Sequence, residues 1–355
     1  MNKKHKLATG NTTDPVSNEQ LLEYWAWLDR ATFTIVKARD KELRKYGLSF
    51  IQGKVLLSLK ILDYAPTIGE LSRWLFREHC SISGITDRMM RRQLIKKYRD
   101  TTKKNITRIA LTEAGEKAYH DMAKRESLLN ILSVLSRDQC HQLGDCLKTT
   151  LDRALNLDDA EYCPDISQTI VGWFSTFLIR NESKMISLPD TSFERVNRSR
   201  ALLDIINSYC PPAQLVTWIY MDHSSHAITR IREKELEKLG LSIVQSKILD
   251  VLKTLKYLPT VGELAKLINR DHNSISGITD RMGKKGLLRK YRDPVKKHLT
   301  RIELTENGEQ TYRSLVNRKS ITNILSFMTP DDCKNNVLYL KKLLDRAQRE
   351  LKSET

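Results

Sequence analysis

Two identical nine-residue segments, each followed by dense Lys and Arg, carry the side chains best suited to binding chemistry. The letters Ser-Ile-Ser-Gly-Ile-Thr-Asp-Arg-Met occupy residues 81–89 and again 274–282. The segments Asp87–Arg108 and Asp280–Arg301 each hold nine Lys or Arg against two Asp, a net charge of +7 each. Together they carry +14 of the chain's net +17. Basic clusters this compact are typical of proteins that bind the phosphates of nucleic acid.

The repeated segment predicts a helix with one apolar and one polar face. At about 100° per residue, Ile82, Ile85 and Met89 fall on the same side. The other side carries small polar and basic residues, which in the two copies are Cys80, Ser81, Ser83, Gly84, Arg88 and Arg91, and Asn273, Ser274, Ser276, Gly277, Arg281 and Lys284. Small side chains permit close approach to base edges in the major groove, where arginine donates to guanine or to phosphate. We therefore predict two DNA-recognition helices; the alternative is a solvent-facing helix that contains a few serines.

Two short stretches of alternating residues, 94–99 and 105–111, predict a β-hairpin after the first recognition helix. The second copy has the stronger turn signal, Asp293-Pro294, at its tip. Lysines at the two tips are expected to reach an adjacent minor groove or the backbone: Lys103, Lys104, Lys296 and Lys297. Flanking cations are expected to contact phosphates and to add affinity without much choice of sequence: Lys96, Lys97, Arg99, Lys290 and Arg292.

These segments need a scaffold, and the spacing of apolar residues predicts one that is mainly helical. Long helices are expected over 18–46, 112–135 and 138–155, and shorter helices begin after the caps Ser49 and Thr67. A helix pair, a recognition helix and a basic hairpin make a winged helix-turn-helix, so the fold class is mainly α with small β-hairpins (α+β). The long outer helices have too much apolar surface to stand alone. We therefore expect two winged domains that form an intrachain pseudo-dimer through their terminal helices.

The chain is one domain written twice. An offset of 193 residues relates the two nine-residue segments, and without a gap it aligns Leu21–Asn156 with Gln214–Arg349. We predict a disordered basic tail at 1–17, the first repeat at 18–157, a helical connector at 158–212 and the second repeat at 213–351. The connector is too apolar for a flexible linker, so its helices are expected to pack on the core.

The remaining sequence signals favour a soluble cytoplasmic protein. No apolar stretch of a signal peptide follows the basic start, and the longest apolar-leaning run, 169–179, is too short to span a bilayer. Six cysteines lie far apart without a CxxC motif, which fits free thiols in a reducing compartment. We predict no membrane partner, no metal and no cofactor.

A few residues allow a second interpretation. Asp222, His223 and His226 could place a carboxylate and two imidazoles together on a helix, although surface or pocket histidines are the favoured interpretation. Cys80 at a helix N-terminus could be an activated thiol, against the alternative of a small exposed side chain. Cys140 and Cys333 occupy matching positions and are expected to help pack the last helices.

The motifs resemble those of the multiple-antibiotic-resistance regulator (MarR) family. They are Gly-Leu-Ser-x-x-Gln, the repeated Ile-Ser-Gly-Ile-Thr-Asp-Arg-Met, Gly286–Pro294 and Ile302–Gly308, with matches in the first repeat that end at Gly115. The resemblance covers both repeats nearly end to end. It implies winged-helix transcription factors that dimerise through terminal helices and bind a palindrome in successive major grooves. It places groove contacts at Ser81, Ser83, Gly84 and Arg88 and at their counterparts Ser274, Ser276, Gly277 and Arg281.

The chain departs from that family's pattern in three places. It resembles a fused dimer where the family uses two chains. Lysines stand at the wing tips where the family carries an arginine, and lysine lacks the planar donor fork. Gln93 stands where a glycine is expected after the recognition helix, so we expect the first copy to end that helix differently.

The resemblance also implies a partner besides DNA. Members of the family often bind small aromatic or phenolic effectors between the dimer helices and the winged domains. A small aromatic effector is therefore a candidate partner here, and its candidate lining residues are Trp25, Trp27, Trp218 and Tyr220. The alternative is that these aromatic side chains are simply core.

The sequence thus predicts a sequence-specific double-stranded DNA-binding transcriptional regulator, a repressor, that works as a monomer acting as a pseudo-dimer. Asn273 can bond adenine in a bidentate way and Cys80 cannot, so we expect an imperfect palindrome with half-sites about one helical turn apart. The alternative is a plasmid replication initiator or another non-regulatory DNA-binding protein with tandem winged helices. We find no phosphate-cradling glycine loop, nucleophile elbow or zinc-hydrolase spacing, so no enzyme is predicted.

Overall fold

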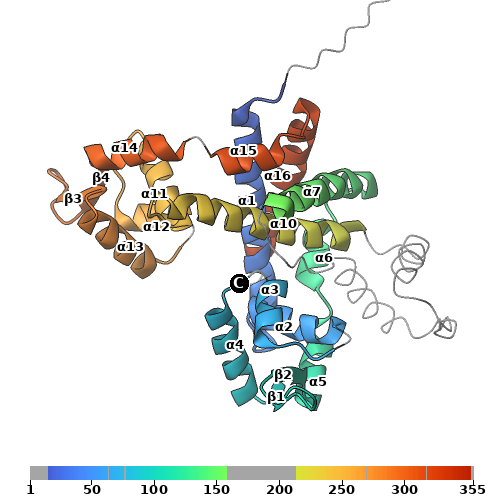
Figure 1. Cartoon of the computed structure of the whole chain (residues 1–355). Coiled ribbons are helices and arrows are strands. Elements are labelled where there is room, and N and C mark those ends of the chain that lie inside the picture. Colours follow the sequence, from blue (N-terminus) through green and yellow to red (C-terminus); the bar gives the residue numbers. More distant parts are fainter. Residues whose placement is uncertain are drawn as a thin grey trace, which may run out of the picture. The chain divides into compact units, whose positions relative to one another are not determined.

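The computed structural model describes residues 15–62, 64–75, 77–157, 213–268, 270–316 and 318–352 (Figure 1). The predicted connector at 158–212 lies outside these residues, as does the predicted tail except for residues 15–17. Within them the chain is mostly helical with two small antiparallel hairpins. It forms two compact units. Unit 1 comprises the residues up to Ala227 together with those from Phe327 onward, and unit 2 comprises Ile228–Ser326.

A winged helix-turn-helix occupies part of unit 1, as the sequence predicted. Its elements are α2 (Phe50–Ile61), α3 (Ile68–Trp74), α4 (His79–Arg91), β1 (Ile95–Arg99) and β2 (Thr107–Leu111) (Figure 1). The two strands pair in a register that runs from Ile95 opposite Leu111 to Arg99 opposite Thr107. One apolar core joins all five elements through Val55, Leu71, Ile82, Ile95 and Ile109, each of them buried. Burial of this core holds the recognition helix and the hairpin in one domain.

The helix starts follow the local signals in the sequence. Ser49 and Thr67 each accept a hydrogen bond from the backbone N–H three residues later, and the residue at that position, Gln52 or Glu70, bonds back to the cap. These are complete capping boxes, which satisfy two of the N–H groups that a helix start leaves open. The predicted caps are confirmed, and they set the direction in which α2 and α3 leave their turns.

The helix predicted over 112–135 is wrong as a single element. The structure has two helices, α5 (Glu113–Met122) and α6 (Glu126–Leu132), with Arg125 between them in the left-handed region at a φ of 51°. Glu42 of α1 (Asn18–Arg44) accepts hydrogen bonds from the N–H groups of Glu126 at 2.9 Å and Ser127 at 3.2 Å. A buried carboxylate from a distant helix therefore caps α6 and ends the continuous helix.

Long helices form the rest of unit 1. They are α1, α7 (Arg137–Leu157), the part of α10 (Ala213–Glu237) up to Ala227, and α16 (Pro330–Lys352). Helix α16 packs along α1 and also contacts α7. Thr217 of α10 donates to the Cys140 carbonyl at 2.9 Å, and Tyr339 of α16 donates to Gln142 at 2.6 Å. Helices from the two ends of the sequence thus share one bundle. Cys140 and Cys333 are buried within it, as predicted.

Unit 2 repeats the winged helix-turn-helix. Its elements are the remainder of α10, α11 (Ile243–Thr254), α12 (Val261–Ile268), α13 (His272–Lys284), β3 (Leu288–Arg292), β4 (Thr300–Leu304), α14 (Glu306–Leu315) and α15 (Lys319–Leu325). The bounds of α13, both strands, α14 and α15 lie 193 residues after those of their counterparts in unit 1. The break recurs too, with Arg318 at a φ of 29° and the Ser320 hydroxyl donating to Glu235. Of all the helices described, none has a stretch long and apolar enough for a membrane span.

Candidate nucleic-acid interface

Helix α4 has the two faces that its sequence predicts. Ile82, Ile85 and Met89 are buried in the core of the winged helix. The opposite side carries the predicted contact residues: Cys80, Ser81, Arg88 and Arg91 are exposed, and Ser83 and Gly84 are half-buried. In α13 the counterparts Asn273, Arg281 and Lys284 are exposed, and Ser274, Ser276 and Gly277 are half-buried. Both copies therefore present small polar side chains between longer basic ones on a face that the core does not use.

Gly84 and Gly277 are not required by the packing of their own helices. A Cβ added at either position would meet only a guanidinium nitrogen, of Arg88 or of Arg281, at 3.7 Å, an ordinary contact. Gly115 is different, because a Cβ there would lie 1.9 Å from the Leu94 carbonyl oxygen. Glycine costs stability in a helix interior. The packing of the fold therefore does not account for the glycine at 84 or at 277.

The two recognition helices end in the same way, so the expectation of a different end at Gln93 is wrong. Gln93 adopts a φ of 57° and Gly286 a φ of 69°. In both copies the next residue donates its N–H across the helix end, Leu94 to Met89 and Leu287 to Met282, at 3.0 Å each. A buried Leu-Ile or Leu-Leu pair follows each helix, with its first residue just before the strand and its second at the start of the strand. Burial of that pair holds Gln93 in a conformation that glycine adopts more readily.

The starts of the two helices do differ. Asp271 caps α13 and accepts a hydrogen bond from the Ser274 N–H at 2.7 Å. The corresponding residue before α4 is Glu78, which makes no side-chain bond to the helix start. The first turn of α4 therefore has no capping carboxylate. Its backbone N–H groups are not bonded by a cap side chain, whereas in α13 the Ser274 N–H is bonded to Asp271.

A salt bridge fastens each hairpin to its recognition helix. Lys97 of β1 donates to Asp87 of α4 at 2.6 Å, and Lys290 of β3 donates to Asp280 of α13 at 2.6 Å. The hydrogen bond from Lys97, followed by its charge, lowers the pKa of Asp87 below the ordinary value, and Lys290 does the same for Asp280. Lys97 and Lys290, which we expected to contact phosphates, are therefore engaged within the protein.

The tip of the first hairpin is built around one carboxylate. Asp100 accepts hydrogen bonds from the N–H groups of Thr102 and Lys103, both at 2.9 Å, and from the Arg108 guanidinium at 2.8 Å. The bond from the Lys103 backbone, with those from Arg108 and Thr102, holds the pKa of Asp100 well below its usual range. Such a turn, closed by an aspartate side chain, gives the tip a defined shape.

The second hairpin repeats this construction. Asp293 accepts from the Val295 and Lys296 N–H groups at 2.9 and 2.8 Å and from Arg301 at 2.7 Å. The Lys296 backbone bond, followed by those from Arg301 and Val295, lowers the pKa of Asp293 to about 2. Both tips are therefore rigid supports for the lysines that they carry.

Exposed cations remain once these internal bonds are counted. Within the described ranges, several in each copy have no salt-bridge partner, among them Arg88, Arg91, Lys96, Lys103 and Lys104, and Arg281, Lys284, Arg292, Lys296 and Lys297. Arg99 is also exposed, and one of its guanidinium nitrogens donates to the Lys104 carbonyl at 3.0 Å, which braces the tip. These groups lie on the recognition helix and its wing, so each winged helix presents a positive surface that its own acidic residues do not neutralise.

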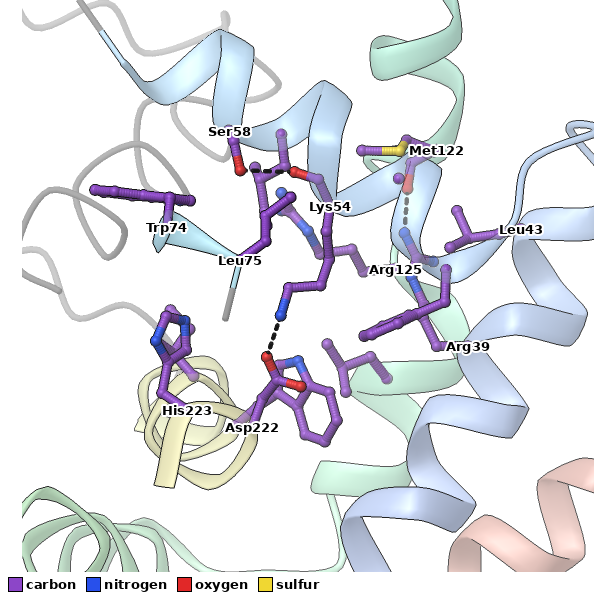
Figure 2. Close-up of a pocket in the computed structure, with 16 residues that line it drawn as sticks. Arg39, Leu43, Lys54, Ser58, Trp74, Leu75, Met122, Arg125, Asp222 and His223 are labelled. Atoms are coloured by element: carbon purple, nitrogen blue, oxygen red, sulfur yellow. Dashed lines mark hydrogen bonds and ion pairs between the residues drawn. The ribbon is translucent and has the colours of Figure 1, made fainter. Parts of the chain in front are cut away.

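A small cavity lies elsewhere in unit 1, between the winged helix and α10 (Figure 2). Its volume is about 60 Å³, and α1, α2, α3 and α10 all contribute to its wall. Of the four aromatic residues considered for an effector, Trp218 lines it, while Trp25, Trp27 and Tyr220 do not. A benzene-sized ligand occupies a cavity of roughly 150 Å³. The cavity would have to widen to accept an aromatic effector.

One carboxylate and one imidazole of α10, those of Asp222 and His223, line this cavity. Asp222 and His223 are buried, and Lys54 donates to Asp222 at 2.7 Å (Figure 2). Burial, followed by the Lys54 charge, lowers the pKa of His223 to about 3, and burial also lowers the pKa of His226 to about 4. Among the described residues, no group of three or more His, Cys, Asp or Glu is placed to hold a metal ion. The interpretation as pocket histidines fits this arrangement.

Sequence reasoning did not find the roles of Asp100, Arg108 and Lys54. The hairpin register would have indicated that Asp100 and Arg108 meet. Asp100 directly follows β1, and Arg108 of β2 lies opposite Tyr98, near the end of β1. The bond between Lys54 and Asp222 joins residues 168 positions apart, and nothing in the local pattern marks it.

No protein-family model matches the chain, and no curated protein sequence matches it. Solved structures that it resembles include a mutant of MarR from E. coli complexed with operator DNA, with 19% identity over 43% of this chain and 98% of that one and a TM-score of 0.30. The YusO protein from Bacillus subtilis matches with 19% identity, over 39% of this chain and 89% of that one, with a TM-score of 0.27.

A third structure is a mutant of MepR from S. aureus bound to an oligodeoxyribonucleotide. It matches with 20% identity, over 34% of this chain and 90% of that one, with a TM-score of 0.26. With identities near one fifth and TM-scores this low, the function of the chain has to be argued from its own residues.

Proposed function

We propose that this protein is a sequence-specific double-stranded DNA-binding transcriptional regulator, and that it acts as a repressor. One observation carries the proposal. Both winged helices present the same small polar face on the recognition helix, beside exposed cations that have no internal partner among the described residues. Small side chains and Arg suit contact with base edges, and free Lys at the hairpin tips suits contact with phosphates.

The residue roles follow from position. The first recognition helix would contact one major groove through Ser81, Ser83, Gly84, Arg88 and Arg91, with Cys80 at the near end of the helix. The second would contact the next major groove through Asn273, Ser274, Ser276, Gly277, Arg281 and Lys284. The two wings would contact the DNA backbone or the minor groove through Arg99, Lys103 and Lys104, and through Arg292, Lys296 and Lys297. Because Cys80 and Asn273 differ in hydrogen bonding, the operator would be an imperfect palindrome.

A single chain would supply both recognition helices. The packing of α16 on α1 within unit 1 supports this, since it brings the last helix of the second repeat into one bundle with the first helix of the first repeat. We therefore keep 18–157 and 213–351 as the two repeats of a monomer that acts as a pseudo-dimer. A small aromatic effector would enter at the cavity beside Trp218 and widen it.

Selection of bound fragments from total genomic DNA tests the proposal. The expected result is one motif with two related half-sites about a helical turn apart, located at promoters. Arg281→Ala should lose roughly 1–3 kcal/mol on the selected DNA and relax the preference at one half-site. Fragments from tandem origin repeats would instead favour a replication initiator, and equal binding to random duplex would refute sequence-specific recognition.

The wing lysines give a matched comparison. Lys296→Ala combined with Lys297→Ala should weaken binding to every sequence and make the dependence of affinity on salt less steep, because counterion release falls with each lost phosphate contact. Binding measured by fluorescence anisotropy over a salt series gives that slope. If the double variant changed sequence preference and left the salt slope unaltered, the assignment of these lysines to phosphates would be wrong.

A further inference from the structure

A buried ion pair links the first winged helix to the helical bundle. Lys54 donates from its ammonium to Asp222 at 2.7 Å, and the two side chains are only 15% and 6% exposed. Figure 2 shows Lys54 reaching from α2 across the cavity to Asp222 on α10. An ion pair that is removed from water this far is held strongly only while both partners are present.

The two partners belong to different substructures of unit 1. Lys54 lies on α2, whose next residues, Val55 and Leu56, are fully buried in the winged-helix core. Asp222 lies on α10, where Ser224 donates to the Leu147 carbonyl at 2.7 Å and so fixes that part of α10 to α7 of the bundle. The pair therefore connects the rigid body that carries α4 to the rigid body that carries the long helices.

The packing between the two bodies is incomplete at this place. The cavity of about 60 Å³ lies here, and apolar groups that face a void lose the dispersion contacts of a close-packed interior. Helix α1 continues from the bundle into the winged-helix core, in which Leu43 is buried. A continuous helix on one side and a void on the other leave room for a pivot, and the ion pair spans that void between α2 and α10.

The environment of Asp222 holds one ammonium group, that of Lys54, and the two imidazoles of His226 and His223. Its Oδ1 atom is buried and has no hydrogen-bond partner among the described residues, and its neighbour His223 is buried as well. Without the lysine, the carboxylate would be left uncompensated beside the cavity. Hydration of that carboxylate would require the cavity to open, which moves α2 away from α10.

We propose that Lys54 and Asp222 form a latch that positions the first recognition helix relative to the bundle and thereby sets the half-site spacing that the chain accepts. This rests on the proposed function, since spacing has meaning only for a protein that binds two half-sites. The two residues touch no DNA in this scheme; they are positioning residues, which act through the orientation of α4.

A measurement without DNA tests the latch itself. Spectroscopic labels carried by unnatural amino acids at Glu113 of α5 and Leu338 of α16, both exposed, report the distance between winged helix and bundle within unit 1. Asp222→Asn keeps the shape of the side chain and removes its charge, and it should broaden the distance distribution. Glu116→Gln breaks the exposed salt bridge of Lys60 and Glu116, 2.9 Å long and internal to the winged helix, and is the matched control. A distribution of unchanged width in Asp222→Asn would overturn the latch.

A second measurement tests its consequence. On DNA with both selected half-sites, Asp222→Asn and Lys54→Met should each bind about tenfold more weakly than the unaltered chain. On DNA with only the half-site of the first recognition helix, they should bind as the unaltered chain does. When base pairs are inserted between the half-sites, the variants should lose less affinity than the unaltered chain.

Equal losses on both DNAs would indicate a general structural role and overturn the proposal. If the unaltered chain showed no half-site preference while the distances still broadened, the proposed function would fail and the latch would stand.

Discussion

The guanidinium of Arg108 and the carboxylate of Asp100 meet at 2.8 Å and close the first hairpin beneath its tip lysines, and Arg301 and Asp293 do the same in the second hairpin at 2.7 Å. Each aspartate also binds backbone N–H groups of the turn, so one carboxylate joins the strand to the tip. The lysines at these tips are thus carried by a loop that the aspartate holds in shape.

Replacement of Asp100 by Asn should loosen that loop. The amide oxygen can still accept hydrogen bonds from the turn, but the NH2 group cannot accept from Arg108, and the loss of charge weakens the bonds from the Thr102 and Lys103 N–H groups. We expect amide hydrogen exchange at these two residues to become several-fold faster, as measured by NMR or mass spectrometry. Asp121→Asn, at an exposed position of α5, is the control. Unchanged exchange at the tip in Asp100→Asn would show that the turn does not depend on the charge.

Replacement of Gly84 by Ala should separate folding from binding. The new Cβ meets only Arg88 at 3.7 Å, so the fold has room for it, and alanine favours a helix interior over glycine by roughly 0.5–1 kcal/mol. The free energy of unfolding should rise by about that amount. Affinity for the selected DNA should nevertheless fall about tenfold, because the methyl group holds the helix away from the base edges.

The control for this prediction is Gly115→Ala. Its Cβ would lie 1.9 Å from the Leu94 carbonyl oxygen, so the backbone must shift and stability should drop sharply. If Gly84→Ala were stabilised yet bound the selected DNA as tightly as the unaltered chain, close approach at this glycine would be excluded.

Gln93 and Gly286 permit a reciprocal exchange. Both adopt positive φ, 57° and 69°, at the same place after a recognition helix. A glycine reaches this region without the steric cost that glutamine meets, so Gln93→Gly should stabilise the fold by about 1 kcal/mol. Gly286→Gln should destabilise it by a similar amount. Thermal denaturation followed by circular dichroism measures both, and shifts of equal sign in the two variants would contradict the shared geometry.

Local patterns were enough for the elements that carry the candidate interface. The capping residues Ser49 and Thr67, the apolar stripe through Ile82 and Met89, and the alternation around the hairpin all depend on neighbours within a few positions, and the structure has each of them where it was predicted. The register of the hairpin likewise depends on neighbouring residues. Because helical spacing is a local pattern, the two faces of α4 could be assigned from the sequence alone.

Features that depend on distant partners were not predictable in this way. The break between α5 and α6 arises because Glu42, 84 residues earlier, binds the N–H of Glu126 and overrides a continuous helical pattern. Gln93 takes a glycine-like conformation because the chain after it buries Leu94, just before β1, and Ile95 at the start of β1. In both cases a tertiary contact outweighs a local preference of about 1 kcal/mol, which spacing in the sequence cannot reveal.

The buried histidines of α10 predict that unit 1 loses stability on mild acidification. Burial lowers the pKa of His223 to about 3 and that of His226 to about 4, whereas an unfolded histidine titrates near 6.5. Below pH 6.5 the unfolded chain therefore takes up protons that the folded chain does not, and this favours unfolding. Each histidine should contribute a slope of up to about 1.4 kcal/mol per pH unit between roughly pH 6 and pH 4.

Urea titrations at a series of pH values, followed by tryptophan fluorescence, measure this slope. Asp222 does not contribute in the same window. Burial acts to raise the pKa of its carboxylate, but the charge of Lys54 outweighs burial and holds the pKa well below the ordinary value, so the stability that Asp222 provides is lost only at lower pH. His223→Gln should reduce the slope to about that of one histidine, and His120→Gln, at an exposed position, is the matched control. A free energy of unfolding that stays constant between pH 6.5 and pH 4.5 would mean that the two imidazoles are accessible to protons in the folded chain.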